Sequence, residues 1–133
     1  MRSKVIGLLF ALAALVGLGL TTAAPASAGT GACGSGNFCA WYLTNYEGPS
    51  ASWAGNDANW SDNWLSNGQN IDNDDRSWRN NGTACGGCDH VRIYDGSNYT
   101  GGQIACLHFG DEGWYPVANP MDRGSSHRWG GEC

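Results

Sequence analysis

The chain opens with one long apolar segment and continues with short apolar runs between polar stretches. A basic start precedes an almost continuous apolar run at 5–20, and small residues at 26–28 end the following stretch. This order is typical of a secretory signal peptide with a small-residue cleavage site. The run is shorter than the roughly 20 residues that a bilayer-spanning helix needs. We therefore expect residues 1–28 to be a signal peptide and residues 29–133 to form one mature domain.

The pattern after residue 28 favours β-structure. No long apolar repeat with a 3.6-residue period occurs, and runs of aromatic and β-branched residues lie at 38–43, 91–94 and 103–109. Stretches rich in Gly, Asn, Ser and Asp, which are turn formers, separate these runs. Several short strands at close spacing are typical of two packed sheets. The sequence therefore predicts an all-β sandwich.

A pattern of aromatic residues and glycine occurs twice in the predicted domain. The spacing aromatic-x4-aromatic-x-Gly is met by two triplets, 53 residues apart: Trp41, Tyr46 and Gly48, and Tyr94, Tyr99 and Gly101. A polar loop follows each copy, at 72–80 and at 121–129. Aligning Ser77 with Ser126 sets these loops 49 residues apart. The domain therefore consists of two similar halves in the same order.

This repeat resembles the double Greek key of the βγ-crystallins. In each half, Gly48 or Gly101 supplies the backbone angles that a tight hairpin needs and that other residues avoid. The resemblance covers about 33–129 and implies two Greek-key motifs whose sheets pack face to face around one core. We therefore expect a disulfide-bonded, βγ-crystallin-like β-sandwich.

In that family the polar loops can bind calcium through an Asx-Asx-x-x-Ser/Thr-Ser pattern. The ligands that the resemblance implies are Asp72, Asn73 and Ser77 in the first loop, and Asp122 and Ser125 in the second. Arg76 stands where the first loop needs a hydroxyl, and Met121 stands where the second loop needs its first Asx. A fixed positive charge opposes a hard cation that binds oxygen. We therefore expect no cofactor, with calcium as the alternative.

Charge and residue types limit the classes of partner. After loss of residues 1–28, five arginines face twelve carboxylates, which gives a net charge of −7. Such a surface repels phosphate backbones and anionic lipid, so we expect no nucleic-acid or membrane partner. We also expect a monomer, which the charge does not test. His90, His108 and His127 are candidate general bases, but none accompanies a recognisable nucleophile motif. We therefore expect no enzymatic activity.

The cysteines lie in the mature domain, and their number is even. They are Cys33, Cys39, Cys85, Cys88, Cys106 and Cys133. In an exported chain this predicts three disulfides. The alternative is a zinc site built on Cys85, Cys88 and His90, but the sequence offers no second ligand pair at zinc spacing.

Within the crystallin-like fold, the chain resembles the Streptomyces metalloproteinase inhibitor family. The resemblance lies in the spacing Cys33-x5-Cys39 with the strand at 38–42, and in the segments at 90–94 and 103–109. In that family the scissile bond follows a cysteine and precedes an apolar residue. The resemblance thus implies Cys106–Leu107 as the reactive bond of a secreted inhibitor. The implied partner is a thermolysin-like zinc metalloprotease, since such enzymes select an apolar residue after the scissile bond.

The disulfide pattern departs from that family. There the reactive cysteine pairs a few residues downstream, whereas the next cysteine after Cys106 here is Cys133. A hairpin with Tyr94 opposite Gly101 would bring Cys106 close to Cys88. The expected bridges are therefore Cys33–Cys39, Cys88–Cys106 and, by elimination, Cys85–Cys133.

Two questions stay open at the level of sequence. Leu107 is either the residue that enters a protease pocket or an ordinary residue of a sheet. The alternatives to an inhibitor are a crystallin-type domain with a structural or weak calcium-binding role, and an antimicrobial or toxin-like protein, because one fold can host several functions. Metal-dependent melting would favour the first alternative, and growth inhibition of microbes would favour the second.

Overall fold

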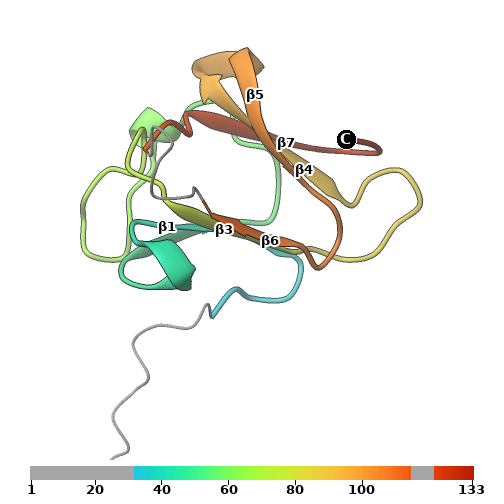
Figure 1. The fold of residues 1–133 in the computed structure, drawn as a ribbon, viewed down its shortest axis with the longest axis horizontal. Helices are drawn as coiled ribbons and strands as arrows, with labels where there is room; N and C mark the ends of the chain where they lie inside the picture. The colour runs from blue at the N-terminus through green and yellow to red at the C-terminus, as the bar shows by residue number, and fades with distance from the viewer. Residues whose placement is uncertain (1–31, 115–121) are drawn as a thin grey trace, which may run out of the picture.

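The computed structural model describes residues 32–114 and 122–133. The predicted signal peptide at 1–28 lies outside the described residues. So does Met121, which stands where the calcium-binding pattern has its first Asx. Figure 1 shows the domain as two layers of strands joined by long loops. The described residues include no helix that is long and apolar enough to cross a membrane.

Within residues 32–114 and 122–133, seven strands form two antiparallel sheets. The first sheet has the order β2-β1-β3-β6, from β1 (Asn37–Trp41), β2 (Ser50–Trp53), β3 (Ser77–Asn81) and β6 (Glu112–Trp114). The second has the order β5-β4-β7, from β4 (His90–Gly96), β5 (Thr100–Leu107) and β7 (Ser126–Gly130). Helical turns in the described part are three-residue 3₁₀ segments: η1 (Thr44–Tyr46), η2 (Trp60–Asp62) and η3 (Ser97–Tyr99).

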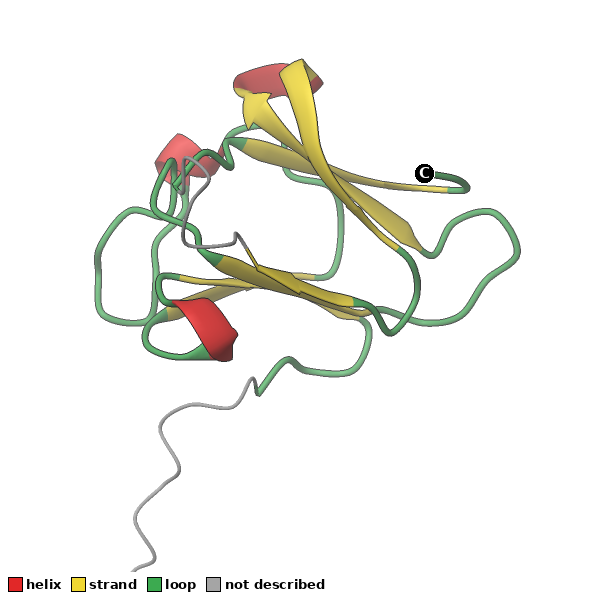
Figure 2. Cartoon of the chain, in the orientation of Figure 1, coloured by secondary structure: helices red, strands yellow, loops and turns green. Residues whose placement is uncertain are grey.

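The two sheets face each other, as Figure 2 shows. One apolar core lies between them. Phe38 and Ala40 of the first sheet and Val91 and Ile93 of the second are fully buried there. Trp60, from the segment after β2, is buried in the same core and stacks with Phe38, with ring centroids 6.2 Å apart. Aromatic rings thus supply the apolar bulk that aliphatic residues supply elsewhere. The predicted all-β sandwich is confirmed.

The two halves of the chain are joined by main-chain pairing. Strand β6 belongs to the second half in sequence but pairs with β3, which places Gly113 opposite Trp78. In return, Asp57 of the first half forms an isolated bridge with His127 of β7. The first sheet therefore contains strands from both halves, and a single bridge joins the first half to the second sheet. The Greek-key connection itself stays a prediction.

The repeated sequence pattern becomes a repeated hairpin corner. In the first half the ring of Tyr46 meets Trp41 edge-on at 5.6 Å, and in the second Tyr99 meets Tyr94 at 6.0 Å. Both corner tyrosines have a φ of 60°. Gly48 follows with a φ of 76°, in the left-handed region where side chains are disfavoured. The sequence repeat therefore encodes a repeated backbone conformation.

One serine closes each corner. Ser77 Oγ donates to the carbonyl of Leu43 at 2.7 Å and accepts from the Tyr46 N–H at 3.0 Å. Ser126 Oγ donates to the carbonyl of Gly96 at 2.6 Å and accepts from the Tyr99 N–H at 3.1 Å. The alignment of Ser77 with Ser126 thus pairs residues with the same structural role.

The disulfides agree with one expected pairing and correct two. Cys33 pairs with Cys39, as expected. The other predicted bridges, Cys88–Cys106 and Cys85–Cys133, were wrong. The structure instead pairs Cys85 with Cys88 and Cys106 with Cys133.

The hairpin register explains this correction. The 3₁₀ turn η3 lets Gly96 pair with Thr100, and register shifts around Tyr94 then place additional residues on β5. Cys106 consequently lies opposite Arg92 instead of near Cys88. Irregular pairing of this kind changes which residues face each other without leaving a signal in the hydrophobic pattern.

Candidate functional site

Leu107 lies at the end of β5 and faces the core. It pairs with Val91 and only 6% of it is exposed. Its carbonyl accepts a hydrogen bond from Asn80 Nδ2 at 3.1 Å. The Leu107 side chain therefore cannot enter a protease pocket while β5 keeps its place in the sheet. This arrangement is the ordinary sheet role that the sequence left open for Leu107.

The chain turns immediately after Leu107 and exposes an aromatic side chain. The Asp111 N–H donates to the carbonyl of His108 at 3.0 Å, and the His108 N–H donates to Asp111 Oδ2 at 3.0 Å. Gly110 has a φ of 81°, which suits glycine at the tight turn. Phe109, between them, is 49% exposed. We call residues 108–111 the aromatic turn.

Buried Asn80 of β3 holds the aromatic turn in place. Its main chain exchanges two hydrogen bonds with the turn: its carbonyl accepts from Gly110 at 3.0 Å, and its N–H donates to Asp111 at 2.9 Å. Its Nδ2 donates to the carbonyls of Asp89 and Leu107, and its Oδ1 accepts from the Gly82 N–H. The main chain of Asn80 and its fully hydrogen-bonded side chain therefore hold the turn that presents Phe109.

The Cys106–Cys133 disulfide spans the aromatic turn along the chain. The bridge joins the end of β5 to the residues that follow β7, with a sequence separation of 27. Strands β6 and β7 lie inside this covalent loop and pair with β3 and β4. A peptide bond cut within 107–132 would therefore leave the two pieces covalently joined.

The candidate calcium ligands are engaged by other protein groups. The Arg76 guanidinium forms two hydrogen bonds with the Asp122 carboxylate, Nε to Oδ1 at 2.8 Å and Nη2 to Oδ2 at 3.2 Å. This contact raises the pKa of Arg76. Arg76 of the first loop thus pairs with the Asp122 carboxylate of the second loop. Its guanidinium supplies the positive charge that a bound cation would supply.

The remaining candidate ligands make other contacts within the chain. Ser77 Oγ serves the hairpin corner, and Asn73 Nδ2 donates to Asp72 Oδ2 at 3.0 Å. Ser125 is buried, and its main chain bonds to Trp60 and Tyr94. The structure thus joins the two loops directly, through Arg76 and Asp122.

Two buried ionisable groups lie where the halves meet. Asp75 Oδ1 accepts from the Gly124 N–H at 2.7 Å and Oδ2 accepts from Trp78 Nε1 at 2.6 Å, yet desolvation raises the pKa of Asp75 to about 6. His127 Nδ1 accepts from Trp60 Nε1 at 2.9 Å, and desolvation lowers the pKa of His127 to about 4. Because His127 stays neutral in the core, it has a structural role.

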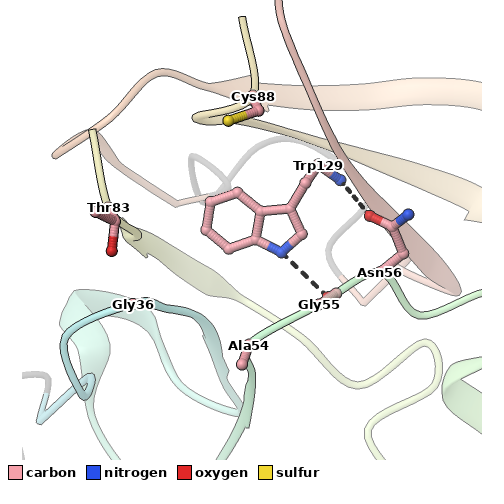
Figure 3. A pocket seen from close by; sticks show the side chains of 7 residues that line it. All are labelled: Gly36, Ala54, Gly55, Asn56, Thr83, Cys88 and Trp129. Atoms are coloured by element: carbon pink, nitrogen blue, oxygen red, sulfur yellow. Dashed lines mark hydrogen bonds between the residues drawn. The ribbon is translucent and has the colours of Figure 1, made fainter. Parts of the chain in front are cut away.

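A hollow of about 400 Å³ opens beside β7 (Figure 3). Its lining consists of Gly36, Ala54, Gly55, Asn56, Thr83, Cys88 and Trp129. Trp129 donates through its main-chain N–H to Asn56 Oδ1 at 2.8 Å and through Nε1 to the carbonyl of Gly55 at 3.1 Å. The lining carries no ionisable side chain, so the hollow itself offers no acid–base pair.

A comparison with protein families adds a decisive observation. The model of peptidase inhibitor family I36, the Streptomyces metalloproteinase inhibitor family, matches residues 26–107, which is more than half of the chain. The chain belongs to this family. Membership of this family makes the chain a peptidase inhibitor, whose partner is a protease. No curated protein and no solved structure matched the chain.

The I36 match ends at the residue before the aromatic turn. Sequence reasoning also overlooked this turn, because it took Phe109 as the last residue of an apolar run at 103–109. The adjacent Gly110 and Asp111, which favour turns, were the available signal. The contribution of Asn80 left no signal, because it depends on contacts between distant strands.

Proposed function

We propose that the chain is exported by the signal peptide at 1–28 and acts as a monomeric inhibitor of a thermolysin-like zinc metalloprotease. Membership of family I36 supports an inhibitor, and three disulfides fit an oxidising compartment. The inhibitor needs no cofactor of its own, since the zinc belongs to the protease. The negative charge of the domain also disfavours nucleic acid and anionic membranes as partners.

The exposed Phe109 on a rigid turn carries this proposal. A thermolysin-like enzyme selects an apolar residue directly after the scissile bond, and Phe109 is an exposed apolar side chain that follows soon after Cys106 in the sequence. The bond that fits is therefore His108–Phe109. Cys106–Leu107, which the family resemblance implied, remains the alternative, but its use requires the end of β5 to leave the sheet.

The surroundings of the turn account for inhibition in place of digestion. Because Asn80 already fixes the turn, binding loses little conformational entropy to ordering it. After a cut, the Cys106–Cys133 bridge and the pairing of β6 and β7 would hold the new ends together. The broken bond could then reform, so the cleaved chain would dissociate slowly from the enzyme.

The test is inhibition of thermolysin by the oxidised mature chain and by its Phe109→Asp variant. We expect tight inhibition by the native chain and a loss of at least 100-fold in the variant, about 3 kcal/mol, as for an aromatic anchor at an interface. Trp64→Asp is the matched control, because Trp64 is an exposed aromatic residue, 64% accessible, in a loop of the first half. It should inhibit as the native chain does.

The position of the cut distinguishes the two candidate bonds. Mass spectrometry of the chain after long incubation with the protease should find a fragment that begins at Phe109, released only after reduction. A fragment that begins at Leu107 would instead establish Cys106–Leu107 as the reactive bond. Absence of inhibition of thermolysin and related zinc proteases would overturn the proposed target class, while family membership would stand.

A further inference from the structure

Two histidines face each other on the outer side of the second sheet. Val91 pairs with Leu107 in the antiparallel register, so the next residue on each side sets His90 opposite His108. Successive side chains alternate between the faces of a strand. Because Val91 and Leu107 point into the core, both histidines point outward. Their rings meet edge to face with centroids 4.5 Å apart.

A carboxylate orients each of these rings. His90 Nδ1 lies 2.9 Å from Asp89 Oδ1, and His108 Nδ1 lies 2.9 Å from Asp111 Oδ2. In the neutral tautomer that donates Nδ1–H to the carboxylate, Nε2 keeps a free lone pair for a ligand. Histidines that bind metals have this arrangement, in which a carboxylate fixes the tautomer and raises the basicity of the ligating nitrogen.

Main-chain groups in turn fix both carboxylates. Asp89 Oδ2 accepts from the Cys85 N–H at 3.1 Å, and this bond, together with the His90 contact, lowers the pKa of Asp89. Asp111 Oδ2 also accepts from the His108 N–H. The orientation of the two imidazoles is therefore set by the backbone before any ligand arrives, which reduces the entropy lost on binding.

We propose that His90 and His108 form a binding site for a divalent first-row transition metal ion, such as Zn²⁺ or Cu²⁺. Ligand atoms of His90, His108 and Cys133 lie within 4.8 Å of one another, close enough for one ion to reach both imidazoles after a small adjustment. Imidazole nitrogen suits zinc, copper and nickel, whereas calcium and magnesium require oxygen ligands. The site therefore selects against the ions that the crystallin-like loops would take.

The site has two protein ligands and open positions. The Cys133 sulfur belongs to the disulfide with Cys106 and offers no thiolate in the oxidised chain. His108 is well exposed, with 60% of its side chain accessible, so water or a donor group from another molecule completes the coordination. His108 also precedes the proposed scissile bond His108–Phe109, so the metal site adjoins the inhibitory contact. Zinc binding is measured in the absence of a protease, so its outcome does not depend on the proposed inhibitory function.

The first experiment is a calorimetric titration of the oxidised mature chain with zinc chloride, followed by ¹H–¹⁵N spectra of the imidazoles. We expect one ion per chain, with the resonances of His90 and His108 shifting and that of His127 unchanged. Calcium chloride in excess should neither bind there nor displace zinc. Absence of zinc binding, or shifts confined to other residues, would overturn the proposal.

Variants assign the site to its residues. His90→Gln and His108→Gln should each weaken zinc binding at least 10-fold, and Asp111→Asn should weaken it about 10-fold, because it removes only the orienting carboxylate. Glu47→Gln, which removes an exposed carboxylate next to the corner of the first half, should bind zinc as the native chain does. Thermal melting without metal checks that each variant is folded. Equal affinity in both histidine variants and the native chain would contradict the assignment.

Discussion

The two halves of the domain agree at their hairpin corners and differ in the loops that meet between them. Ser77 and Ser126 make equivalent hydrogen bonds, and Arg79 and Arg128 lie 5.4 and 5.5 Å from the rings of the corner tyrosines. Position 75, in contrast, is a buried aspartate, and its counterpart 49 residues later is Gly124. Few residue types can adopt the backbone angles of a hairpin corner, so its sequence is repeated. At the interface between the halves, any pair of complementary groups can form the contact, so the residues differ.

The buried groups of this interface differ in chemistry as well as in position. Asp75 belongs to the first half and bonds to Gly124 of the second. His127 belongs to the second half and bonds to Trp60 of the first. Each half thus supplies one ionisable side chain that the other half satisfies, which links the two halves through polar contacts inside the core.

The largest expected effect concerns how the free energy of unfolding depends on pH, because the pKa values of Asp75 and His127 are shifted in opposite directions. Asp75 has a raised pKa of about 6 in the folded chain, against 3.8 when unfolded, so its contribution to stability is present below 3.8 and is lost as pH rises through 6. His127 has a lowered pKa of about 4, against 6.5, so its contribution is present above 6.5 and is lost as pH falls through 4. Each amounts to about 3 kcal/mol.

Single variants separate the two contributions. Between pH 6.5 and pH 4, the free energy of unfolding should fall by about 3 kcal/mol in Asp75→Asn and rise by about 3 kcal/mol in His127→Gln. The native chain should change little, because the two contributions offset each other. Urea unfolding at pH 4, 5, 6 and 7 measures these slopes. Parallel pH profiles for both variants would show that the groups do not oppose each other.

A smaller effect tests the similarity of the corners. Ser77→Ala and Ser126→Ala each remove two hydrogen bonds at a corner, so each should lower the free energy of unfolding by about 2 kcal/mol. The two losses should agree to within about 0.5 kcal/mol, since the contacts are equivalent. Ser97→Ala, at an exposed position in η3, is the control and should cost little. Unequal losses in urea unfolding would mean that only the backbone shape repeats.

The smallest effect concerns the loops. Arg76→Ser removes the partly exposed ion pair with Asp122 and restores a hydroxyl to the calcium pattern. We expect a loss of about 0.5 kcal/mol without metal and a melting temperature that rises with calcium only in the variant. Arg123→Ser, which removes the contact with Asp95 instead, is the control. A native chain that calcium stabilises equally would contradict the view that Arg76 takes the place of the cation.

The sequence predicted the features that depend on local geometry. The spacing of Trp41, Tyr46 and Gly48 identified the corner and its copy, and the turn formers identified an all-β sandwich. Features that depend on distant contacts were missed. The shifts around Tyr94 changed the partner of Cys106, and the pairing of Arg76 with Asp122 joins loops from different halves. Side-chain alternation along β5 could still have indicated that Leu107, next to exposed His108, faces the core.

The exchange of strand β6 between the halves affects how the chain reaches its fold. The first sheet is incomplete until 112–114 pair with β3, so most of the domain must be present before that sheet closes. Pairings between distant residues require long loops to close first, which makes folding slow. A first half made alone would leave β3 as an open edge with unpaired main-chain groups, a template for intermolecular pairing. Each half therefore needs the other to avoid aggregation.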